Sequence, residues 1–185
     1  MRNLPISAAL VLAFAISPAL AADYVQAPGS SLAFAGKYQG EVFTGSFPAF
    51  TSTLSFDPAD LASARLDVVI PLMGATTGNT DYDAQMLGDG FLAITKFPQA
   101  RYTATTFRNL GNQQYAAVGM LSLHGFQKPV TLTFTWTPGA SPLLVGSATV
   151  RRLDFGVGAG DWADTSLIPD DIAVSTRLRL TPATP

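Results

Sequence analysis

The segment LSLHGFQKPVTLTFTW, residues 121–136, contains the only histidine of the chain, His124. A histidine can serve as a general base, a metal ligand or a polar side chain at a turn. Nucleophilic catalysis needs a hydroxyl or thiol beside the base and a third group that orients the base. Ser122 is expected on the same strand face, but no third group accompanies it, and a histidine-based zinc site usually has two or more histidines. Because Gly125 follows directly, we predict that His124 lies where a strand enters a turn, with its ring hydrogen-bonded to the backbone.

The segment FGVGAGDWADTSLIPDD, residues 155–171, is rich in glycine and aspartate. A phosphate-binding loop requires Gly-Lys-Ser or Gly-Lys-Thr after its glycines, whereas Asp161 and Trp162 follow here. The aspartates could bind calcium, but they lack the alternate-position spacing of a calcium loop. We interpret the segment as a solvated loop whose Trp162 packs over a barrel mouth.

No strand face carries the paired carboxylates that glycosidases use. Together with the two segments above, this predicts a protein without catalytic or metal-binding residues, that is, not an enzyme. Catalysis through Ser122 or His124 is the competing hypothesis. A His124→Ala variant that keeps its fold and ligand would argue against it.

The composition favours one compact domain that does not bind nucleic acid. The 185 residues are 48% hydrophobic and only 13% charged, the formal net charge is −2, and no cysteine is present. The longest basic run is Arg151-Arg152, which we interpret as strand-end charges in water, whereas nucleic-acid binding needs a clustered basic face. Without cysteine the protein can form neither disulfides nor thiolate–metal sites.

The N-terminal residues 1–21, MRNLPISAALVLAFAISPALA, have the anatomy of a secretory signal peptide. A basic residue precedes an apolar run, which ends in a small-x-small motif before the expected cleavage after Ala21. The run is shorter than the roughly 20 residues that a membrane span needs. We therefore predict a secreted protein whose residues 22–185 form a single domain.

Alternation of apolar and polar residues recurs along the mature chain and predicts half-buried strands. The clearest case is Val130–Thr137, where four apolar residues alternate with four threonines. The same pattern extends over Ala64–Leu72 and Ile172–Leu180. Weaker candidates are Ser31–Tyr38, Glu41–Phe47, Phe50–Phe56, Ala100–Phe107, Gln114–Leu123 and Leu143–Arg151, for a total of about nine strands.

One segment interrupts this alternation and predicts a short helical insertion near residues 79–92. Gly78-Asn79-Thr80-Asp81 is a plausible helix start with acids in the first turn. Tyr82, Met86 and Leu87 then fall on one apolar side, and the glycines at 88 and 90 should end the helix. The fold class is therefore mainly β, an antiparallel barrel or sandwich with one helical insertion.

Aromatic residues exceed what a small filled barrel must hold. The chain has 12 phenylalanines and 2 tryptophans, and several methionines accompany them. Any one of these side chains could simply be part of the core. As a group they are typical of apolar ligand pockets, and an eight-stranded barrel is wide enough to enclose one small ligand.

Four segments of the sequence resemble the YceI-like family of bacterial proteins. The most specific pieces are TTGNTDYDAQMLGDGF with the following Phe97-Pro98, and LHG with KPV at residues 123–130. The resemblance extends over about Asp23 to Leu180. It implies a lipocalin-like extended antiparallel barrel of about eight strands, secreted to the periplasm, that holds a polyisoprenoid, an isoprenoid quinone or a fatty amide. Asp161-Trp162-Ala163-Asp164 resembles the subgroup that accompanies cytochrome b561-type membrane proteins.

We therefore expect a carrier protein with a tunnel lined by apolar strand faces. The expected wall residues are Phe43, Phe47, Leu132, Phe134 and Trp136. Met86, Leu87 and Phe91 should close one end, with Phe155 and Trp162 near the other. No covalent cofactor is expected.

The alternatives are an accessory subunit that presents quinone to a cytochrome b561-type protein, and a protein that sequesters foreign apolar compounds. Edge strands could also form a homodimer.

Overall fold

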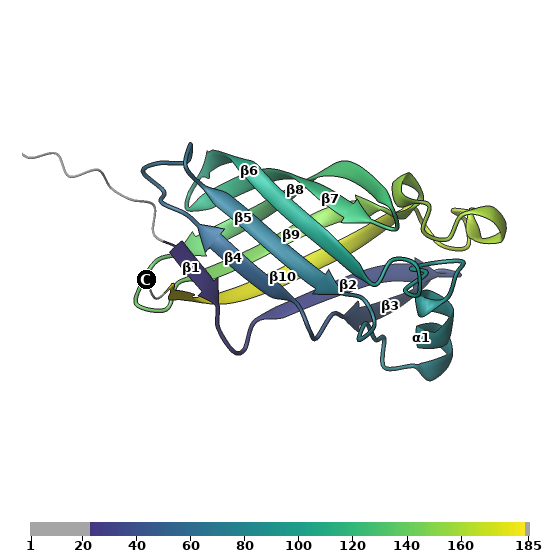
Figure 1. Cartoon of the computed structure of the whole chain (residues 1–185). Coiled ribbons are helices and arrows are strands. Elements are labelled where there is room, and N and C mark those ends of the chain that lie inside the picture. The colour runs from purple at the N-terminus through teal and green to yellow at the C-terminus, as the bar shows by residue number, and fades with distance from the viewer. Residues whose placement is uncertain (1–22, 184–185) are drawn as a thin grey trace, which may run out of the picture.

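The computed structural model describes residues 23–183 (Figure 1). The predicted signal peptide, residues 1–21, lies outside the described residues. Within them, no helix is both long and apolar enough to span a membrane.

Ten antiparallel strands, one α-helix and two short 3₁₀ helices make up the described chain. The strands are β1 (Asp23–Gln26), β2 (Ser31–Tyr38), β3 (Glu41–Ser46), β4 (Thr51–Ser55), β5 (Arg65–Pro71), β6 (Gln99–Gly111), β7 (Gln114–Leu123), β8 (Phe126–Thr137), β9 (Leu143–Arg151) and β10 (Asp171–Pro182). The helices are α1 (Thr80–Leu87), η1 (Arg152–Phe155) and η2 (Gly160–Trp162).

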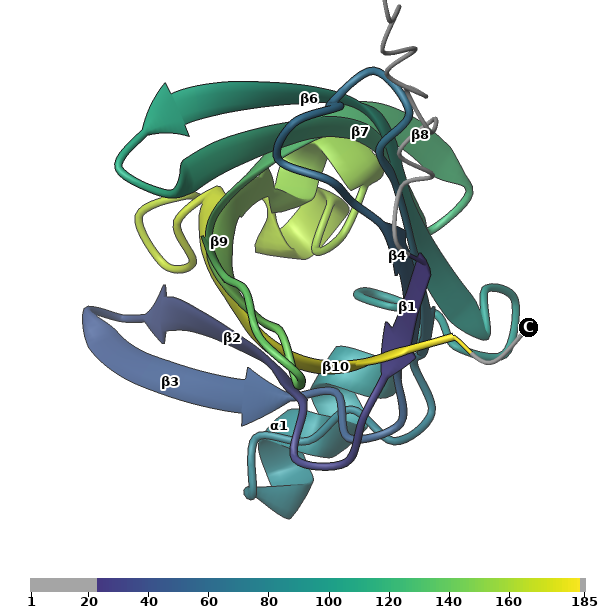
Figure 2. The same ribbon diagram turned by 90° about the vertical axis from the view of Figure 1, so that its left-hand side faces the viewer.

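The sheet closes into a barrel because β10 has two neighbours on one edge. The order β1-β4-β5-β6-β7-β8-β9-β10 returns to β1, which closes a ring of eight strands. β1 pairs with the C-terminal end of β10, whereas β2 pairs with its N-terminal half and carries β3 on its other side. The β2–β3 hairpin therefore branches from the ring, as the view along the barrel shows (Figure 2).

Strand alternation sets which side chains enter the barrel, because successive side chains point to opposite faces of a sheet. On β8, Leu132, Phe134 and Trp136 are buried, while Thr131, Thr133 and Thr137 are exposed. This is the pattern that the sequence predicts for residues 130–137.

An aromatic plug fills the end of the barrel where β1 closes on β10. Its members are Tyr24, Phe56, Phe107, Tyr115, Phe134 and Trp136. Phe56 is 1% exposed and lies at the centre, with ring centroids 5.0–5.8 Å from those of four other members. Tilted and edge-on pairs at these separations are favourable aromatic arrangements, so this half of the barrel is a solid core.

Most strands begin and end within two residues of the predicted positions, and the larger differences have local causes. β2, β7 and β9 have the predicted bounds. β6 continues to Gly111, beyond the predicted end at residue 107, because the reversal occurs at Asn112 and Gln113, which both have positive φ. β8 begins at Phe126, four residues before its alternation starts, and the four residues of β1 are too few for alternation to indicate a strand in the sequence. The helix ends at Leu87, so residues 88–92 form turns.

Candidate functional site

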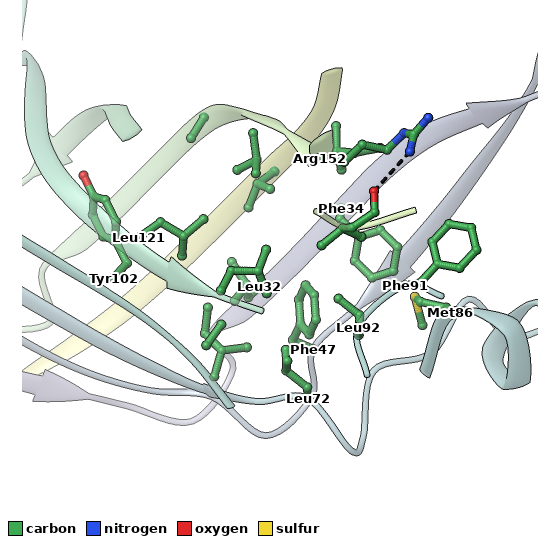
Figure 3. A pocket seen from close by; sticks show the side chains of 18 of the residues that line it. Leu32, Phe34, Phe47, Leu72, Met86, Phe91, Leu92, Tyr102, Leu121 and Arg152 are labelled. Carbon is green, nitrogen blue, oxygen red and sulfur yellow. Dashed lines mark hydrogen bonds between the residues drawn. The ribbon is translucent and has the colours of Figure 1, made fainter. Parts of the chain in front are cut away.

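A cavity of about 470 Å³ occupies the half of the barrel opposite the plug (Figure 3). Its wall is built from inward-facing residues of the ring strands, from the β2–β3 hairpin, and from the segments around α1 and η2. The apolar lining consists of Leu32, Phe34, Phe43, Phe47, Leu66, Val68, Ile70, Leu72, Met86, Phe91, Leu92, Ala100, Leu121, Leu123, Val130, Leu132, Ala148, Val150, Val157, Ile168, Ile172, Val174 and Leu178. The volume lies within the roughly 300–1,000 Å³ typical of small-molecule sites.

Polar lining residues gather at the α1 end of the cavity, which we call the mouth. Thr77, Asp81, Tyr82 and Gln85 come from α1 and its approach, and face Tyr38 at the end of β2. The ring centroids of Tyr38 and Tyr82 are 6.3 Å apart. These side chains can donate and accept hydrogen bonds at the rim of an otherwise apolar space.

Trp162 belongs to the same mouth. Its ring centroid lies 5.5 Å from that of Phe91 and 6.5 Å from that of Tyr38. The prediction that Trp162 and Phe155 lie at the end opposite to Met86 and Phe91 is therefore wrong. The chain turns back after β9, so η1 and η2 lie at the same end as α1, and the opposite end is closed by the plug.

A carboxylate anchors α1 at the mouth. The side chain of Asn79 caps the helix by accepting from the N–H groups of Asp81 and Tyr82. Asp83 accepts from the hydroxyl of Thr76 at 2.6 Å, and from the N–H and hydroxyl of Thr77 at 2.6 and 2.7 Å. These bonds, the Thr76 hydroxyl bond foremost, hold the pKa of Asp83 below its ordinary value.

The interpretation of Arg151-Arg152 as two strand-end charges in water is wrong for Arg152. Arg152 is only 3% exposed and borders the cavity. A guanidinium has five N–H donors, and all five are used here. They donate to the carbonyl oxygens of Val157, Gly158, Trp162, Ile168 and Pro169 at 2.7–3.2 Å. Burial lowers the pKa of Arg152, while nearby Asp170 raises it. The guanidinium thus fixes the loop that carries Trp162.

Arg151 lies on the outer side and fits the predicted role. Its side chain is 63% exposed and its Nε donates to Asp170 at 2.9 Å. Burial raises the pKa of Asp170, but hydrogen bonds from the N–H of Leu153 and from Arg151 outweigh burial, so the pKa of Asp170 lies below its ordinary value. The two arginines differ in burial because β9 ends at Arg151 and η1 begins at Arg152.

Tyr102 is a buried polar residue of the lining. Its hydroxyl donates to the carbonyl of Ala117 at 2.8 Å and lies 3.1 Å from the carbonyl of Val130. Burial raises the pKa of Tyr102 to about 12. The hydroxyl therefore stays protonated at neutral pH and is committed to the wall.

His124 lies outside the cavity lining, at the β7–β8 turn, with φ +52°. Its Nδ1 lies 3.0 Å from the carbonyl oxygen of Phe155, so Nδ1 carries the proton in this bond. The ring also packs on Phe97, with centroids 4.9 Å apart. Ser122 accepts instead from Gln127 at 2.9 Å. The prediction of a turn histidine bonded to backbone is confirmed.

Six of the ten predicted ligand-binding residues line the cavity and four do not. Those on the wall are Phe43, Phe47, Met86, Phe91, Leu132 and Trp162. Phe134 and Trp136 belong to the plug, Phe155 is buried in the main core, and Leu87 packs against the small cluster of Leu72, Ala75, Leu92 and Ala100. Alternation identifies the inward face of β8, but it cannot show how far along the barrel the cavity extends. Contact of the six with a ligand stays a prediction.

Several residues of the cavity lining are not among those predicted from the sequence. Tyr38 and Tyr82 are brought together by β2 and α1, which lie far apart in the sequence. Phe34 occurs in a segment predicted as a strand, and its inward position follows from the alternation of Leu32, Phe34 and Gly36. No sequence signal separates Arg152 from Arg151.

Known proteins share this architecture. The family described as YceI-like domain matches residues 24–180. A UPF0312 protein of Shewanella denitrificans is 31% identical over 163 residues, which cover 82% of this chain and 84% of that relative. A UPF0312 protein of Yersinia pestis is 34% identical over 125 residues, or 65% of each chain.

Two solved structures are similar over most of their length. BcnA of Burkholderia cenocepacia has a TM-score of 0.78 at 27% identity and covers 84% of this chain and 96% of its own. A polyisoprenoid binding domain from Saccharophagus degradans has a TM-score of 0.68 at 17% identity, with 89% and 99% covered. The predicted cytochrome b561-type partner and the homodimer stay predictions.

Proposed function

Because the chain belongs to the YceI-like family, we propose that it is a periplasmic carrier that holds one long apolar lipid, of the isoprenoid or isoprenoid-quinone class, in its barrel. The observation that carries this proposal is the distribution of polarity in the cavity. The body is apolar, and its polar residues Tyr102 and Thr176 are bonded to backbone carbonyls. The remaining polar side chains of the lining lie at the mouth.

This distribution suits a ligand with an apolar tail and a polar head. The tail would lie between the wall and the plug, and the head would lie beside Tyr38, Tyr82 and Gln85 at the mouth. The polyisoprenoid binding domain of similar fold supports the ligand class. The predicted signal peptide supports the compartment.

Burial of the tail supplies most of the binding free energy. Each CH₂ removed from water contributes about 0.8 kcal/mol, so ten buried methylenes give about 8 kcal/mol before the cost of ordering. Chain length and shape therefore matter more for affinity than any single hydrogen bond at the mouth.

Native mass spectrometry of the protein purified from the periplasm tests the proposal. We expect a complex with one lipid, which solvent extraction and fragmentation identify as a prenyl chain with or without a quinone ring. An empty protein that also fails to take up long prenols in titration would contradict it.

A matched pair of variants on β9 makes the test specific for the cavity. Ala148 lines the cavity, whereas its neighbour Thr149 is exposed on the outer face. Ala148→Phe should fill part of the space and lower lipid occupancy, while Thr149→Phe should leave occupancy unchanged. Equal occupancy in both variants would place the lipid elsewhere.

A further inference from the structure

The β2–β3 hairpin places two phenylalanines directly opposite two glycines on the cavity wall. In the register of the hairpin Phe34 pairs with Gly45, and Phe43 pairs with Gly36. Both phenylalanines line the cavity. We propose that Gly36 and Gly45 set the width of the cavity, and that this width lets the protein accept methyl-branched chains in preference to unbranched chains. The inference rests on the proposed function, because it presumes a chain in this cavity.

The ring of Phe34 lies against the backbone of Gly45. A Cβ atom at position 45 would lie 2.2 Å from Cζ of Phe34 and 2.6 Å from its Cε1, whereas ordinary contact begins at 3.4 Å. An alanine at position 45 therefore requires the ring to move by about 1 Å, because atoms in a packed interior cannot overlap. The absent side chain is what allows the ring to lie close to the wall.

Gly36 has the same relation to Phe43. A Cβ atom there would lie 2.6 Å from Cζ of Phe43 and 3.0 Å from Cδ1 of Ile172 on β10. The two pairs thus occupy a checkerboard in which each strand gives one ring and one glycine. Each ring packs against the backbone of the glycine opposite it on the neighbouring strand.

Backbone conformation does not explain these two glycines. Neither adopts the left-handed φ that favours glycine, unlike Gly40 at the tip of the same hairpin with φ +87°. Alanine is therefore compatible with the backbone at positions 36 and 45, and glycine is in general the weaker strand former. Space for the rings is the remaining structural role.

The rings of Phe34 and Phe43 can move away from an added Cβ only toward the lumen. The centroid of Phe34 is already 5.1 Å from that of Phe47, which also lines the cavity. Phe43 cannot retreat toward β10, because Ile172 occupies that side of Gly36. Alanine at either position therefore pushes a ring into the lumen and narrows it. A methyl branch widens a chain. A narrower lumen therefore lowers the affinity for branched chains more than the affinity for straight chains.

Competition between two alcohols with the same main chain tests the inference. Phytanol is hexadecanol with added methyl branches, so the two probes share the length of their main chain and differ in width and in the apolar surface of the branches. Comparison of each variant with wild type cancels the difference in apolar surface. Equal amounts are added to the delipidated protein, and native mass spectrometry gives the ratio of the two complexes. We expect Gly45→Ala and Gly36→Ala to lower the phytanol-to-hexadecanol ratio by about fourfold for each branch that no longer fits.

Two further variants control for indirect effects. Gly74→Ala should leave the ratio unchanged, because a Cβ there meets only Pro48 at 3.6 Å. Phe34→Leu in the Gly45→Ala background should restore the wild-type ratio, since it removes the displaced ring, and the two sites are then shown to be coupled. Circular dichroism confirms that each variant is folded.

The outcomes separate the inference from the proposed function. A wild-type protein that binds neither alcohol contradicts the proposed function and the inference with it. Binding of both alcohols with the same ratio in wild type and in both glycine variants overturns the inference alone. A lowered ratio that Phe34→Leu fails to restore also overturns it, because the ring would not be the cause.

Discussion

Arg152 is a single side chain that organises one side of the cavity mouth. Its donors satisfy carbonyl oxygens from residues 157, 158, 162, 168 and 169, which are distributed along the loop between η1 and β10. A buried carbonyl without a donor costs free energy. The loop therefore depends on a side chain with many donors in a fixed plane.

We expect Arg152→Lys to destabilise the protein although the charge is kept. Lysine has three donors and no planar fork, so at least two carbonyls lose their partners. The free energy of unfolding should fall by about 3 kcal/mol, measured by urea denaturation. Arg151→Lys is the control, since that side chain is mostly exposed, and it should change stability little. Equal effects of the two substitutions would contradict the role of Arg152.

The structural positions of some residues can be predicted from the sequence, whereas those of others cannot. The place of His124 follows from its neighbour Gly125 at a tight reversal, which is a local property. The place of Arg152 depends on where β9 ends relative to η1 and on carbonyls up to 17 residues away, so no local pattern contains it.

At the scale of elements, the helix α1 is held by Asp83 more than by burial. None of its residues is fully buried. The three hydrogen bonds from Thr76 and Thr77 lower the pKa of Asp83 in the folded state. Their stabilisation is complete above the unfolded-state pKa, near 3.8, and it is lost as pH falls through the lower folded-state pKa.

We therefore expect acid to loosen α1 before the barrel. Hydrogen exchange over residues 76–87, corrected for the intrinsic pH dependence, should lose protection between pH 5 and about pH 2 while β7 and β8 keep theirs. Asp83→Asn should reproduce part of this loss at pH 5, and Asp81→Asn on the same helix serves as control. Uniform loss of protection in all elements would contradict the prediction.

Elements with long alternation are the ones that the sequence predicts well. The inward face of β8 follows from alternation alone. β1 has four residues and acquires its structure from β4 and β10, which are distant in sequence, so it could not be predicted. The capping residue Asn79 is predictable because a helix start is a local signal.

At the scale of the whole molecule, the barrel is solid at one end and hollow at the other. In the proposed function, the plug around Phe56 would limit how deep a chain can reach, and the mouth would hold its head. The sequence predicts a barrel with surplus aromatic residues, but it cannot divide them between plug and wall. Phe134 and Trp136 share a strand face with Leu132, yet only Leu132 lines the cavity.

We expect Phe134→Ala to lengthen the cavity at a cost in stability. Removal of this ring, which is 2% exposed, should lower the free energy of unfolding by about 3–5 kcal/mol. If the new space joins the cavity beside Leu132, a mixture of prenols should yield complexes with longer chains than in wild type, measured by native mass spectrometry. Phe126→Ala is the control, since Phe126 on the same strand is 48% exposed. Unchanged chain lengths in a folded Phe134→Ala protein would show that the plug does not limit the tail.

The branched edge of β10 has a mechanical consequence. The ring of eight strands closes through β1, so the β2–β3 hairpin is not needed to complete it. The hairpin is held to the ring by the pairing of β2 with β10 and by the bridge between Ser46 and Thr76. Loss of these pairings would leave every pairing of the eight-stranded ring in place. The two closures on this edge of β10 are therefore structurally independent: β1 completes the ring, and the hairpin supplies the part of the cavity wall that contains Phe34 and Phe43.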